Sequence, residues 1–403
     1  MDAYKIRRDF PVFSGGSDDP VYLDNACQTL RPRQVINASN EYYYRFPACS
    51  GRSVHHFATE VSIRVEESRE RIAKFIGCPH PNEIIFTKNC TEALNLVAKG
   101  LKLKNEDIVL ISDIEHNSNY IPWLQLEQQR GIKRKIIPTT REGIFDIEVF
   151  KNLMSRKVKV VSFAHANNVT GTSIPAKEIA EIAHDYGAVV VFDGAQAAPH
   201  MPLNITELDA DFYAFSMHKM LGPAGVGVLF GKEELLENLD PLVVGGGSID
   251  RVTASEVYYL SLPEKLESGL LNYSGIIGSG AAIEYLERIG MDEICSHVQM
   301  LNRHVTEILK NNDRIDIIGP ADYKLRGNIF SFNVKGLTPH DVAMILDQMK
   351  GVMVRSGMHC SHIFFINRQI DGCVRASFYV YNTVEDCEIL IKTLQQAIHL
   401  FSI

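Results

Sequence analysis

The sequence predicts a doubly wound α/β fold with a second, smaller α+β domain, and three observations lead to this prediction. From residue 58 onward, helical patterns alternate with short apolar runs, as they do in βαβ units. The run AVVVFD at 188–193 is apolar at nearly every position, which is typical of a strand buried on both faces of a parallel sheet. After about residue 257, long helices mixed with shorter strands replace the alternation.

The α/β part begins with an amphipathic helix. It is expected over 58–77, because apolar residues recur at helical spacing and Gly77 follows the last turn. The next elements are expected to be a strand at 83–87, a helix at 90–101, strands at 107–112 and 159–165, a helix at 176–187 and a strand at 188–193. Ligands of open α/β sheets bind beyond the carboxyl ends of the strands, so we expect the functional site at that edge.

The second part contains helical patterns and short apolar runs in no regular alternation. Helices are expected at 273–290, 294–312, 340–349 and 384–401, and strands at 315–319, 329–334 and 373–378. A chain of 403 residues is also longer than a single hydrophobic core usually supports. We therefore expect a large domain over residues 21–257, a small domain over 258–403, and an N-terminal segment, residues 1–20, that packs on the small domain or on a partner subunit.

The charge and hydropathy of the chain exclude several classes of function. The formal net charge is −8, and no basic stretch offers an electrostatic footprint for nucleic acid or for a membrane surface. No window approaches the apolar length of a bilayer-spanning helix, and the N-terminus lacks the apolar core of a signal peptide. These patterns indicate a soluble, cytoplasmic protein.

The cysteines show no metal-binding or disulfide pattern. Eight cysteines are scattered along the chain without a single C-x-x-C pair, which argues against a zinc site and against a small disulfide framework. We therefore expect free thiols and no metal. Most should be small buried hydrophobic residues, and sequence context has to identify any reactive one.

A lysine and an aspartate stand at chemically unusual places. Lys219 lies between an apolar run and a glycine-rich turn in FYAFSMHKMLGPAGVGVLF, residues 212–230, where a charge is costly to desolvate. Asp193 ends the buried strand at 188–193. Taken alone, this aspartate is equally typical of a helix N-cap, and the lysine is compatible with a surface position. Together they are the two groups that pyridoxal phosphate needs, an acid beside its ring nitrogen and a lysine that can lose its proton.

Several motifs, in order, resemble the class V aminotransferase family of pyridoxal-phosphate enzymes. The two segments around Asp193 and Lys219 carry the resemblance, together with VYLDNA, TKNCTEALNLVA, IEHNSNYIPW, NNVTGTSIP and VRASFYVYNTVED. The similarity runs from about Val21 to the last helix. It implies the aspartate-aminotransferase type of fold (fold type I), with a mostly parallel seven-stranded sheet in the large domain.

The resemblance also implies roles for individual residues. Lys219 would bond covalently to the cofactor and move the substrate Cα proton, Asp193 would pair with the pyridine nitrogen, and His116 would stack on the ring. The phosphate would be bound by Cys90, Thr91, Ser216 and His218, the phenolic oxygen would lie near Gln196 and Asn168, and the substrate carboxylate would be held by Arg375. A guanidinium is suited to that last task because it can bind a carboxylate through two parallel hydrogen bonds.

A second segment indicates the branch of the family. VMVRSGMHCSHIFF resembles the active-site loop of group II cysteine desulfurases and selenocysteine lyases, in which Arg355, Gly357, His359 and Cys360 present a nucleophilic thiol. A thiol among an arginine, histidines and a bound cofactor should gain thiolate character, and the thiolate is the attacking form. By the same resemblance, Arg355 and His55 lie near the substrate.

The reaction implied is the conversion of L-cysteine to L-alanine. Sulfur would move to Cys360 as a persulfide and then to an acceptor protein, as in iron–sulfur cluster assembly, and the enzyme would be a homodimer. Selenocysteine lyase would use the same residues, whereas an epimerase, another β-lyase or an aminotransferase would not need Cys360. A non-catalytic binding or scaffold protein on the same fold is the alternative from a different class.

Some positions depart from the family pattern. Leu270 and Leu271 stand where a threonine usually contacts the partner subunit's phosphate, so we expect that contact to be lost. Asn117 replaces a second histidine, and Cys90 stands where a small hydroxyl residue is usual. The segment VVGGGSID, residues 243–250, is expected to be a loop that one subunit lends to the other.

Overall fold

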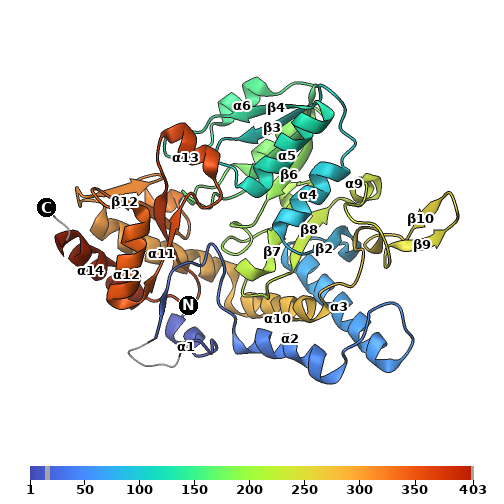
Figure 1. Ribbon diagram of the computed structural model, residues 1–403, viewed down its shortest axis with the longest axis horizontal. Helices are drawn as coiled ribbons and strands as arrows, with labels where there is room; N and C mark the ends of the chain where they lie inside the picture. Colours follow the sequence, from blue (N-terminus) through green and yellow to red (C-terminus); the bar gives the residue numbers. More distant parts are fainter. Residues whose placement is uncertain (14–18, 401–403) are drawn as a thin grey trace.

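A seven-stranded sheet forms the centre of the computed structural model, which describes residues 1–13 and 19–400 (Figure 1). The strand order is β2-β8-β7-β6-β5-β3-β4, in which β8 runs antiparallel to both neighbours and the other pairs are parallel. The strands are β2 (Ile84–Thr87), β3 (Ile108–Ser112), β4 (Lys133–Ile137), β5 (Val158–Ala164), β6 (Val189–Asp193), β7 (Phe212–Ser216) and β8 (Gly227–Gly231). The prediction of a mostly parallel seven-stranded sheet is confirmed.

Alternate residues of the central strands belong to two hydrophobic cores, one on each face of the sheet. Val190 and Phe192 of β6 pack in a core with residues of α3, α7 and α10, whereas Val191 packs with residues of α4 and α5. Burial on both faces explains why these strands are continuously apolar in sequence. The helices of this part are α2 (Arg33–Arg45), α3 (His56–Phe75), α4 (Cys90–Gly100), α5 (Asn117–Arg130), α6 (Ile147–Leu153), α7 (Ala176–Asp185), α8 (Ile205–Leu208) and α9 (Glu233–Asn238).

A second, four-stranded antiparallel sheet lies toward the C-terminus. Its order is β11-β12-β15-β14, and it packs with α11 and α14 around a separate hydrophobic core (Figure 1). The elements are β11 (Ile315–Ile318), β12 (Ile329–Val334), β14 (Arg355–Gly357), β15 (Cys373–Ser377), α10 (Tyr273–Ile289), α11 (Met291–Leu309), α12 (Pro339–Lys350), α13 (His362–Arg368) and α14 (Val384–Leu400). The long helices and short strands expected after residue 257 are therefore present.

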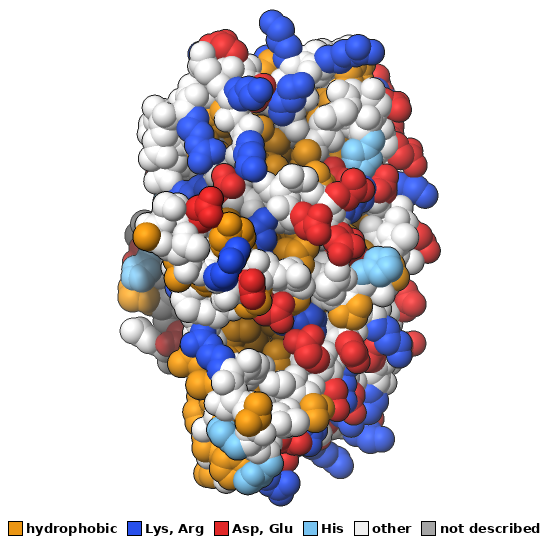
Figure 2. Space-filling model, turned by 90° about the vertical axis from the view of Figure 1, so that its right-hand side faces the viewer, with side chains coloured by type: hydrophobic (Ala, Val, Ile, Leu, Met, Phe, Trp, Pro, Cys, Tyr) orange, Lys and Arg blue, Asp and Glu red, His pale blue; other side chains and the backbone are white. Residues whose placement is uncertain are grey.

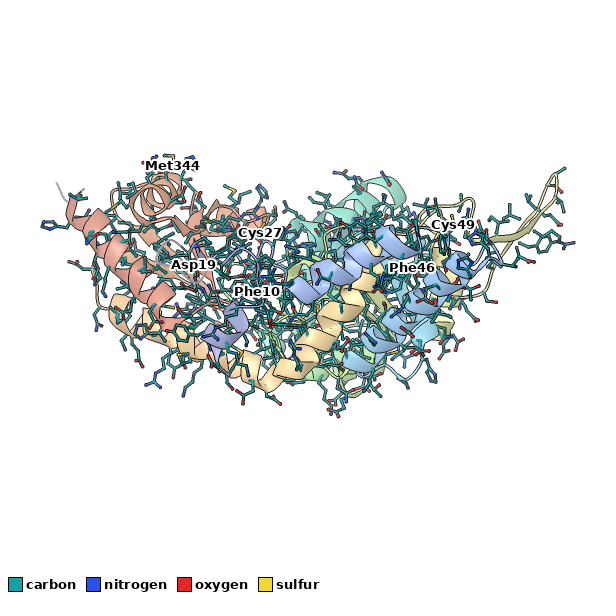
Figure 3. The ribbon with its side chains drawn as sticks, turned by 90° about the horizontal axis from the view of Figure 1, so that it is seen from below. Phe10, Asp19, Cys27, Phe46, Cys49 and Met344 are labelled. Carbon is teal, nitrogen blue, oxygen red and sulfur yellow. The ribbon has the colours of Figure 1, made fainter. Side chains whose placement is uncertain are left out.

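The N-terminal residues lie against the C-terminal elements. In α1 (Ala3–Arg7), Arg7 donates hydrogen bonds to the Asp386 carboxylate of α14 at 3.0 Å, and the ring of Phe10, labelled in Figure 3, packs against Tyr381. Strand β1 (Val21–Tyr22) pairs in parallel with β13 (Val352–Met353). Residues 14–18 of the expected N-terminal segment lie outside the described residues. The domain boundaries stay predictions; α10, which follows the expected boundary, packs against α2 and α3.

A hairpin that the sequence analysis did not predict extends from one end of the molecule. It consists of β9 (Ile249–Val252) and β10 (Val257–Tyr259), which pair antiparallel and project beyond the helices around them (Figure 1). Hydrophobic side chains show between charged ones on the face of the molecule at this end (Figure 2). Within residues 1–13 and 19–400, no helix is long and apolar enough to cross a membrane.

Candidate active site

A cavity of about 210 Å³ brings together nearly all of the predicted site residues. It lies at the carboxyl ends of β6 and β7, as expected for an open α/β sheet. The predicted residues that line it are Lys219, Cys360, His116, Asp193, Gln196, Cys90, Thr91, Asn168, Ser216, His218, Arg355 and Arg375. They come from both sheets and from segments far apart in the sequence.

Lys219 is positioned by the strand that precedes it. All five residues of β7 are buried, and a single 3-10 turn, Met217–Lys219, then carries the lysine to the edge of the sheet. Burial lowers the pKa of the Lys219 amine, and the negative charge of Asp193 opposes that shift. A lysine in such surroundings loses its proton more readily than a solvated one, which suits an amine that must act as a base or nucleophile.

Asp193 is held by two donors on one oxygen. Its Oδ1 accepts the backbone N–H of Ala195 at 2.9 Å and faces the thiol of Cys90 at 3.3 Å. The side chain is only 4% exposed, so this carboxylate stands in a low-dielectric environment. Because the two hydrogen bonds it receives from described residues both use Oδ1, Oδ2 stays available to a ring nitrogen in the cavity.

Cys90 and Ser216, two of the predicted phosphate ligands, lie in direct contact. The Cys90 N–H donates to Ser216 Oγ at 2.8 Å. Burial and the neighbouring Asp193 raise the pKa of the Cys90 thiol well above its usual value, so the thiol stays protonated and donates to the carboxylate. The hydroxyl of the next residue, Thr91, bonds to Ser118 Oγ at 2.7 Å.

Helix α4 begins at this edge of the cavity because a glycine allows close approach. Asn89 caps the helix, and its side chain accepts the N–H of Glu92. A side chain at Gly227, the first residue of β8, would place a Cβ 2.4 Å from the Asn89 backbone. The glycine therefore lets the N-terminus of α4 lie against β8, and the dipole of α4 favours an anion at that N-terminus.

His116 caps α5 and has one ring nitrogen committed to that task. Its Nδ1 accepts the backbone N–H of Ser118 at 3.1 Å, which leaves the proton on Nε2. Burial and the charge of Lys219 lower the pKa of His116 to about 4, so the imidazole is neutral at neutral pH. Its flat, uncharged ring lines the cavity, as the predicted stacking role requires.

Buried polar atoms without a protein partner indicate that this cavity receives a polar ligand. Arg375 is 2% exposed and donates from Nη1 to the Asn168 carbonyl at 2.9 Å and from Nη2 to Asp24 Oδ1 at 3.2 Å. Its Nε has no hydrogen-bond partner among the described residues, and neither has Gln196 Oε1. Buried polar groups are nearly always satisfied, so the residues present fit a cofactor and a carboxylate-bearing substrate.

Cys360 lies on a strained loop between β14 and α13. Both His359 (φ 48°) and Cys360 (φ 58°) adopt the left-handed conformation, which non-glycine residues rarely adopt and which persists only where the surroundings enforce it. Asn168 Nδ2 donates to the His359 carbonyl at 2.7 Å, and the Asn117 backbone N–H donates to the Cys360 carbonyl at 2.6 Å. Asn168 Oδ1 also accepts the hydroxyl of Ser361 at 2.9 Å. No feature of the sequence signalled this strain.

Two further residues that contact arginines of the cavity were not predicted. Cys27 lines the cavity, and Arg355 Nη1 donates to Cys27 Sγ at 2.7 Å. Asp24, three residues earlier, pairs with Arg375. The motif VYLDNA was recognised as a family feature, but only the three-dimensional contacts show that the carboxylate and thiol that follow its strand face the two arginines.

His55 does not line this cavity. It is exposed and caps the N-terminus of α3, where its Nδ1 accepts the N–H of Ala58 at 3.3 Å. Its role at the substrate stays a prediction. All eight cysteines are free, and no group of three or more His, Cys, Asp or Glu side chains in the described part of the chain is suited to hold a metal ion.

Comparison with known proteins shows the family to which this chain belongs. The sequence profile of the family described as "Aminotransferase class-V" matches residues 21–390, nearly the whole chain. This chain belongs to the aminotransferase class-V family. Within it, the chain is 40% identical to a "Probable cysteine desulfurase" from Streptomyces coelicolor, an alignment that covers 100% of this chain and 98% of the relative. It is also 40% identical to one from Halalkalibacterium halodurans, covering 100% and 99%.

Solved structures of cysteine desulfurases have the same fold. The apo structure of a cysteine desulfurase from Thermococcus onnurineus superposes with a TM-score of 0.94 at 38% identity, covering 98% of each chain. The cysteine desulfurase CsdA from Escherichia coli, in an S-sulfonic acid form, gives 0.91 at 31% identity and covers 99% of each chain. The fold-type prediction is therefore confirmed.

Proposed function

We propose that this protein is a pyridoxal-phosphate-dependent cysteine desulfurase, which converts L-cysteine to L-alanine and takes up the sulfur on Cys360. The observation that carries the proposal is the convergence of Lys219, Asp193, Arg375 and Cys360 on one cavity. The two full-length relatives at 40% identity, both named probable cysteine desulfurases, support it.

The cofactor end of the cavity is formed by residues on the large sheet. Pyridoxal 5'-phosphate, when bound, supplies an electron sink for negative charge that develops at the substrate Cα. Lys219 would hold the cofactor, Asp193 Oδ2 would accept a hydrogen bond from the ring nitrogen, and His116 would lie against the ring. Gln196, Thr91 and His218 would bind the remaining polar groups. Asn168 would lie near the phenolic oxygen. The Cys90 thiol donates to Asp193, and the Cys90 N–H donates to Ser216 Oγ.

The substrate end combines a carboxylate site with a thiol. Arg375 would bind the α-carboxylate of L-cysteine through its unpartnered Nε and its neighbouring N–H groups. Lys219 Nζ, with its lowered pKa, would take the Cα proton. Cys360 Sγ would then attack the substrate sulfur, so that the carbon–sulfur bond breaks and a sulfur–sulfur bond forms. The carbon fragment keeps the electron pair, takes up one proton at Cβ, and regains the Cα proton from Lys219 to become L-alanine.

A homodimer would cover exposed hydrophobic residues at the end of the molecule that carries the hairpin. Val243, Val244 and Leu270 are at least half exposed, and so are Val252 and Val257 of the projecting hairpin. Exposed apolar patches of this kind are typical of subunit interfaces. The segment 243–250 would then contact the partner subunit, with Leu270 and Leu271 packing there in place of a phosphate contact.

The same interface would bring His55 to a substrate site. Arg52, close to His55 in sequence, donates from Nη2 to the Gly269 carbonyl at 3.4 Å, so this loop lies beside the segment that carries Leu270. His55 is exposed there, and in the proposed dimer it would face the partner subunit's cavity. A sulfur-acceptor protein would approach Cys360, which is half-exposed on its loop.

The proposal is tested with the purified, cofactor-loaded protein and L-cysteine. We expect L-alanine and sulfide in equal amounts when a reductant is present, and we expect the substitution Cys360→Ala to abolish their formation. If Cys360→Ala forms alanine at the wild-type rate, the persulfide mechanism is wrong. A parallel assay with selenocysteine compares the rates for the two substrates and so measures the preference between sulfur and selenium.

A further inference from the structure

The cavity contains a second accessible thiol for which the proposed reaction has no use. Cys27 follows β1 and lines the same cavity as Cys360 and Lys219. Both Cys27 and Cys360 are half-exposed, whereas Cys78, Cys90, Cys373 and Cys387 are buried. Burial raises the pKa of the Cys78 and Cys373 thiols to about 12, which makes them inert. Cys27 therefore differs from the structural cysteines of this chain.

One arginine connects the two thiol-bearing segments. Arg355 Nη1 donates to Cys27 Sγ at 2.7 Å, and Arg355 itself begins β14, the strand that leads into the Cys360 loop. The guanidinium places a permanent positive charge beside Cys27. A persulfide carries an anionic outer sulfur when ionised, so this charge favours sulfur that is held on Cys27.

The loop around Cys27 is fixed in place by bonds on both sides. Before Cys27, the Ala26 backbone N–H donates to Ser377 Oγ at 2.9 Å, and Gln196 Nε2 donates to the Ala26 carbonyl at 2.8 Å. After it, the Thr29 N–H donates to the His218 carbonyl at 3.0 Å. Cys27 is thus held at the cavity by one residue of β15 and by residues of the turns that follow β6 and β7. One of these, Gln196, has an Oε1 that is buried without a partner among the described residues.

We propose that Cys27 is a second sulfur-accepting thiol, which takes the outer sulfur from the Cys360 persulfide within the cavity. This inference rests on the proposed function, because the proposed reaction is what places sulfur on Cys360. In the transfer, Cys27 Sγ attacks the outer sulfur, the bond between that sulfur and Cys360 Sγ breaks, and a new sulfur–sulfur bond forms on Cys27. Any proton on Cys27 passes to the departing Cys360 sulfur. Oxidation states balance, so no further oxidant or reductant is needed.

The transfer has a consequence for turnover. Once its sulfur has moved, Cys360 is a free thiol again and can attack a second L-cysteine before any acceptor arrives. The subunit then stores sulfur on two residues. An acceptor would reach the sulfur either on the Cys360 loop or on the Arg355 side of the cavity.

The test uses the cofactor-loaded full chain with a few equivalents of L-cysteine per subunit and with no added reductant or acceptor. Samples are quenched with an alkylating reagent and digested with trypsin, which separates the two thiols because Arg33 and Arg355 lie between them in the sequence. Mass spectrometry should find added sulfur on Cys360 first and on Cys27 later. The burst of alanine should be about twice as large in the wild type as in Cys27→Ser.

Cys49 and Cys360 provide the controls. Cys49 is also half-exposed but lies toward the end that carries the β9–β10 hairpin, away from Cys27 (Figure 3). Cys49→Ser should leave the burst unchanged, and Cys49 should stay unmodified. In Cys360→Ser, Cys27 should remain free of added sulfur.

Three results would overturn the inference. Sulfur that appears on Cys27 in Cys360→Ser, or on Cys49 as fast as on Cys27, would mean that Cys27 reacts without a relay. Sulfur that stays on Cys360 alone while alanine forms would refute the relay and leave the proposed function intact. If neither alanine nor any sulfur adduct forms, both the relay and the proposed function fail.

Discussion

The lysine side and the thiol side of the cavity are built in different ways. Asp193 ends β6, whose last residue is paired in register with Ala214 of β7, and Lys219 follows β7 within one turn. Their positions are fixed by backbone hydrogen bonds of a buried sheet. Cys360, in contrast, lies on two consecutive left-handed residues that are held by side chains such as Asn168. The lysine side is therefore rigid, whereas the thiol side depends on single side-chain contacts and is the part suited to move.

The largest effect is expected at the lysine side. Lys219→Ala should remove the protein's visible absorbance with added cofactor and lower alanine formation by about 10³-fold or more, since covalent attachment and proton transfer are both lost. The exposed Lys99→Ala, on α4, serves as the matched control and should change neither quantity. An unchanged visible spectrum in Lys219→Ala would refute the assignment of the lysine.

A substitution at the thiol side should separate cofactor binding from the removal of sulfur. Cys360→Ala should retain the visible absorbance of the wild type and lose alanine formation to nearly the same extent as Lys219→Ala, because the cofactor end is unaffected while the sulfur has no acceptor. Spectroscopy and alanine quantification on the same sample check this. A parallel loss of absorbance would show that the two sides are not independent.

The lysine side could be predicted better than the thiol side for a physical reason. The apolar runs around Asp193 and Lys219 are local patterns that the buried sheet requires, so the strands and their ends could be placed from the sequence alone. The positive φ of His359 and Cys360 arises from contacts with Asn168 and Asn117, which are distant in sequence, and no local pattern reveals it.

Contacts between distant segments account for the other surprises as well. The hydrogen bond from Arg355 to Cys27 connects two segments that are far apart in the sequence. The hydrogen bond from the Cys90 thiol to Asp193 likewise forms only once the chain has folded. The β9–β10 hairpin was missed because its residues are exposed on both faces and therefore lack the alternation of a half-buried strand.

The rigid side also contains a pH-sensitive carboxyl. Glu115, directly before His116, is buried and accepts hydrogen bonds from Ser112 Oγ, from Asn119 Nδ2 at 2.7 Å and from the Ala164 N–H at 2.8 Å. Burial raises the pKa of Glu115 to about 7 from a usual value of 4.5. The folded protein therefore binds more protons than the unfolded chain between these values, and stability falls as the pH rises through that window.

The size of this effect can be measured with a matched variant. The difference in pKa corresponds to a loss of roughly 3 kcal/mol in the free energy of unfolding that is complete above about pH 7. In denaturant titrations, Glu115→Gln should flatten the decline of the free energy of unfolding between about pH 5 and pH 8. The substitution Glu148→Gln, at an exposed glutamate, should retain that decline. An identical slope in Glu115→Gln and the wild type would contradict the raised pKa.

A smaller effect is expected at the substrate carboxylate. Arg375→Lys loses the planar fork and should weaken carboxylate binding by about 1.5–3 kcal/mol. This corresponds to an increase in KM for L-cysteine of roughly 10- to 150-fold. Arg326→Lys, at another fully buried arginine, is the control for general destabilisation and should lower the Tm without changing KM. A rise in KM of the same size in both variants would refute a specific role for Arg375.

The smallest effect is expected where the thiol loop is held. Ser361→Ala removes the hydroxyl that donates to Asn168 Oδ1, a bond worth about 1 kcal/mol. The looser loop should lower the rate of sulfur transfer to Cys360 by roughly 5-fold, with no change in visible absorbance. Ser361→Thr, which keeps a hydroxyl, should restore part of the rate. An unaffected rate in Ser361→Ala would show that the loop needs no support from Asn168.

The central claim is that Lys219 and Cys360 act on one L-cysteine molecule from opposite sides of a single cavity. The most direct measurement mixes the cofactor-loaded protein with one equivalent of L-cysteine, quenches early, and quantifies alanine together with the sulfur adduct on Cys360. We predict that the two appear in step in the wild type and that both are absent in Lys219→Ala. Alanine that accumulates while neither Cys360 nor Cys27 carries added sulfur would contradict the account.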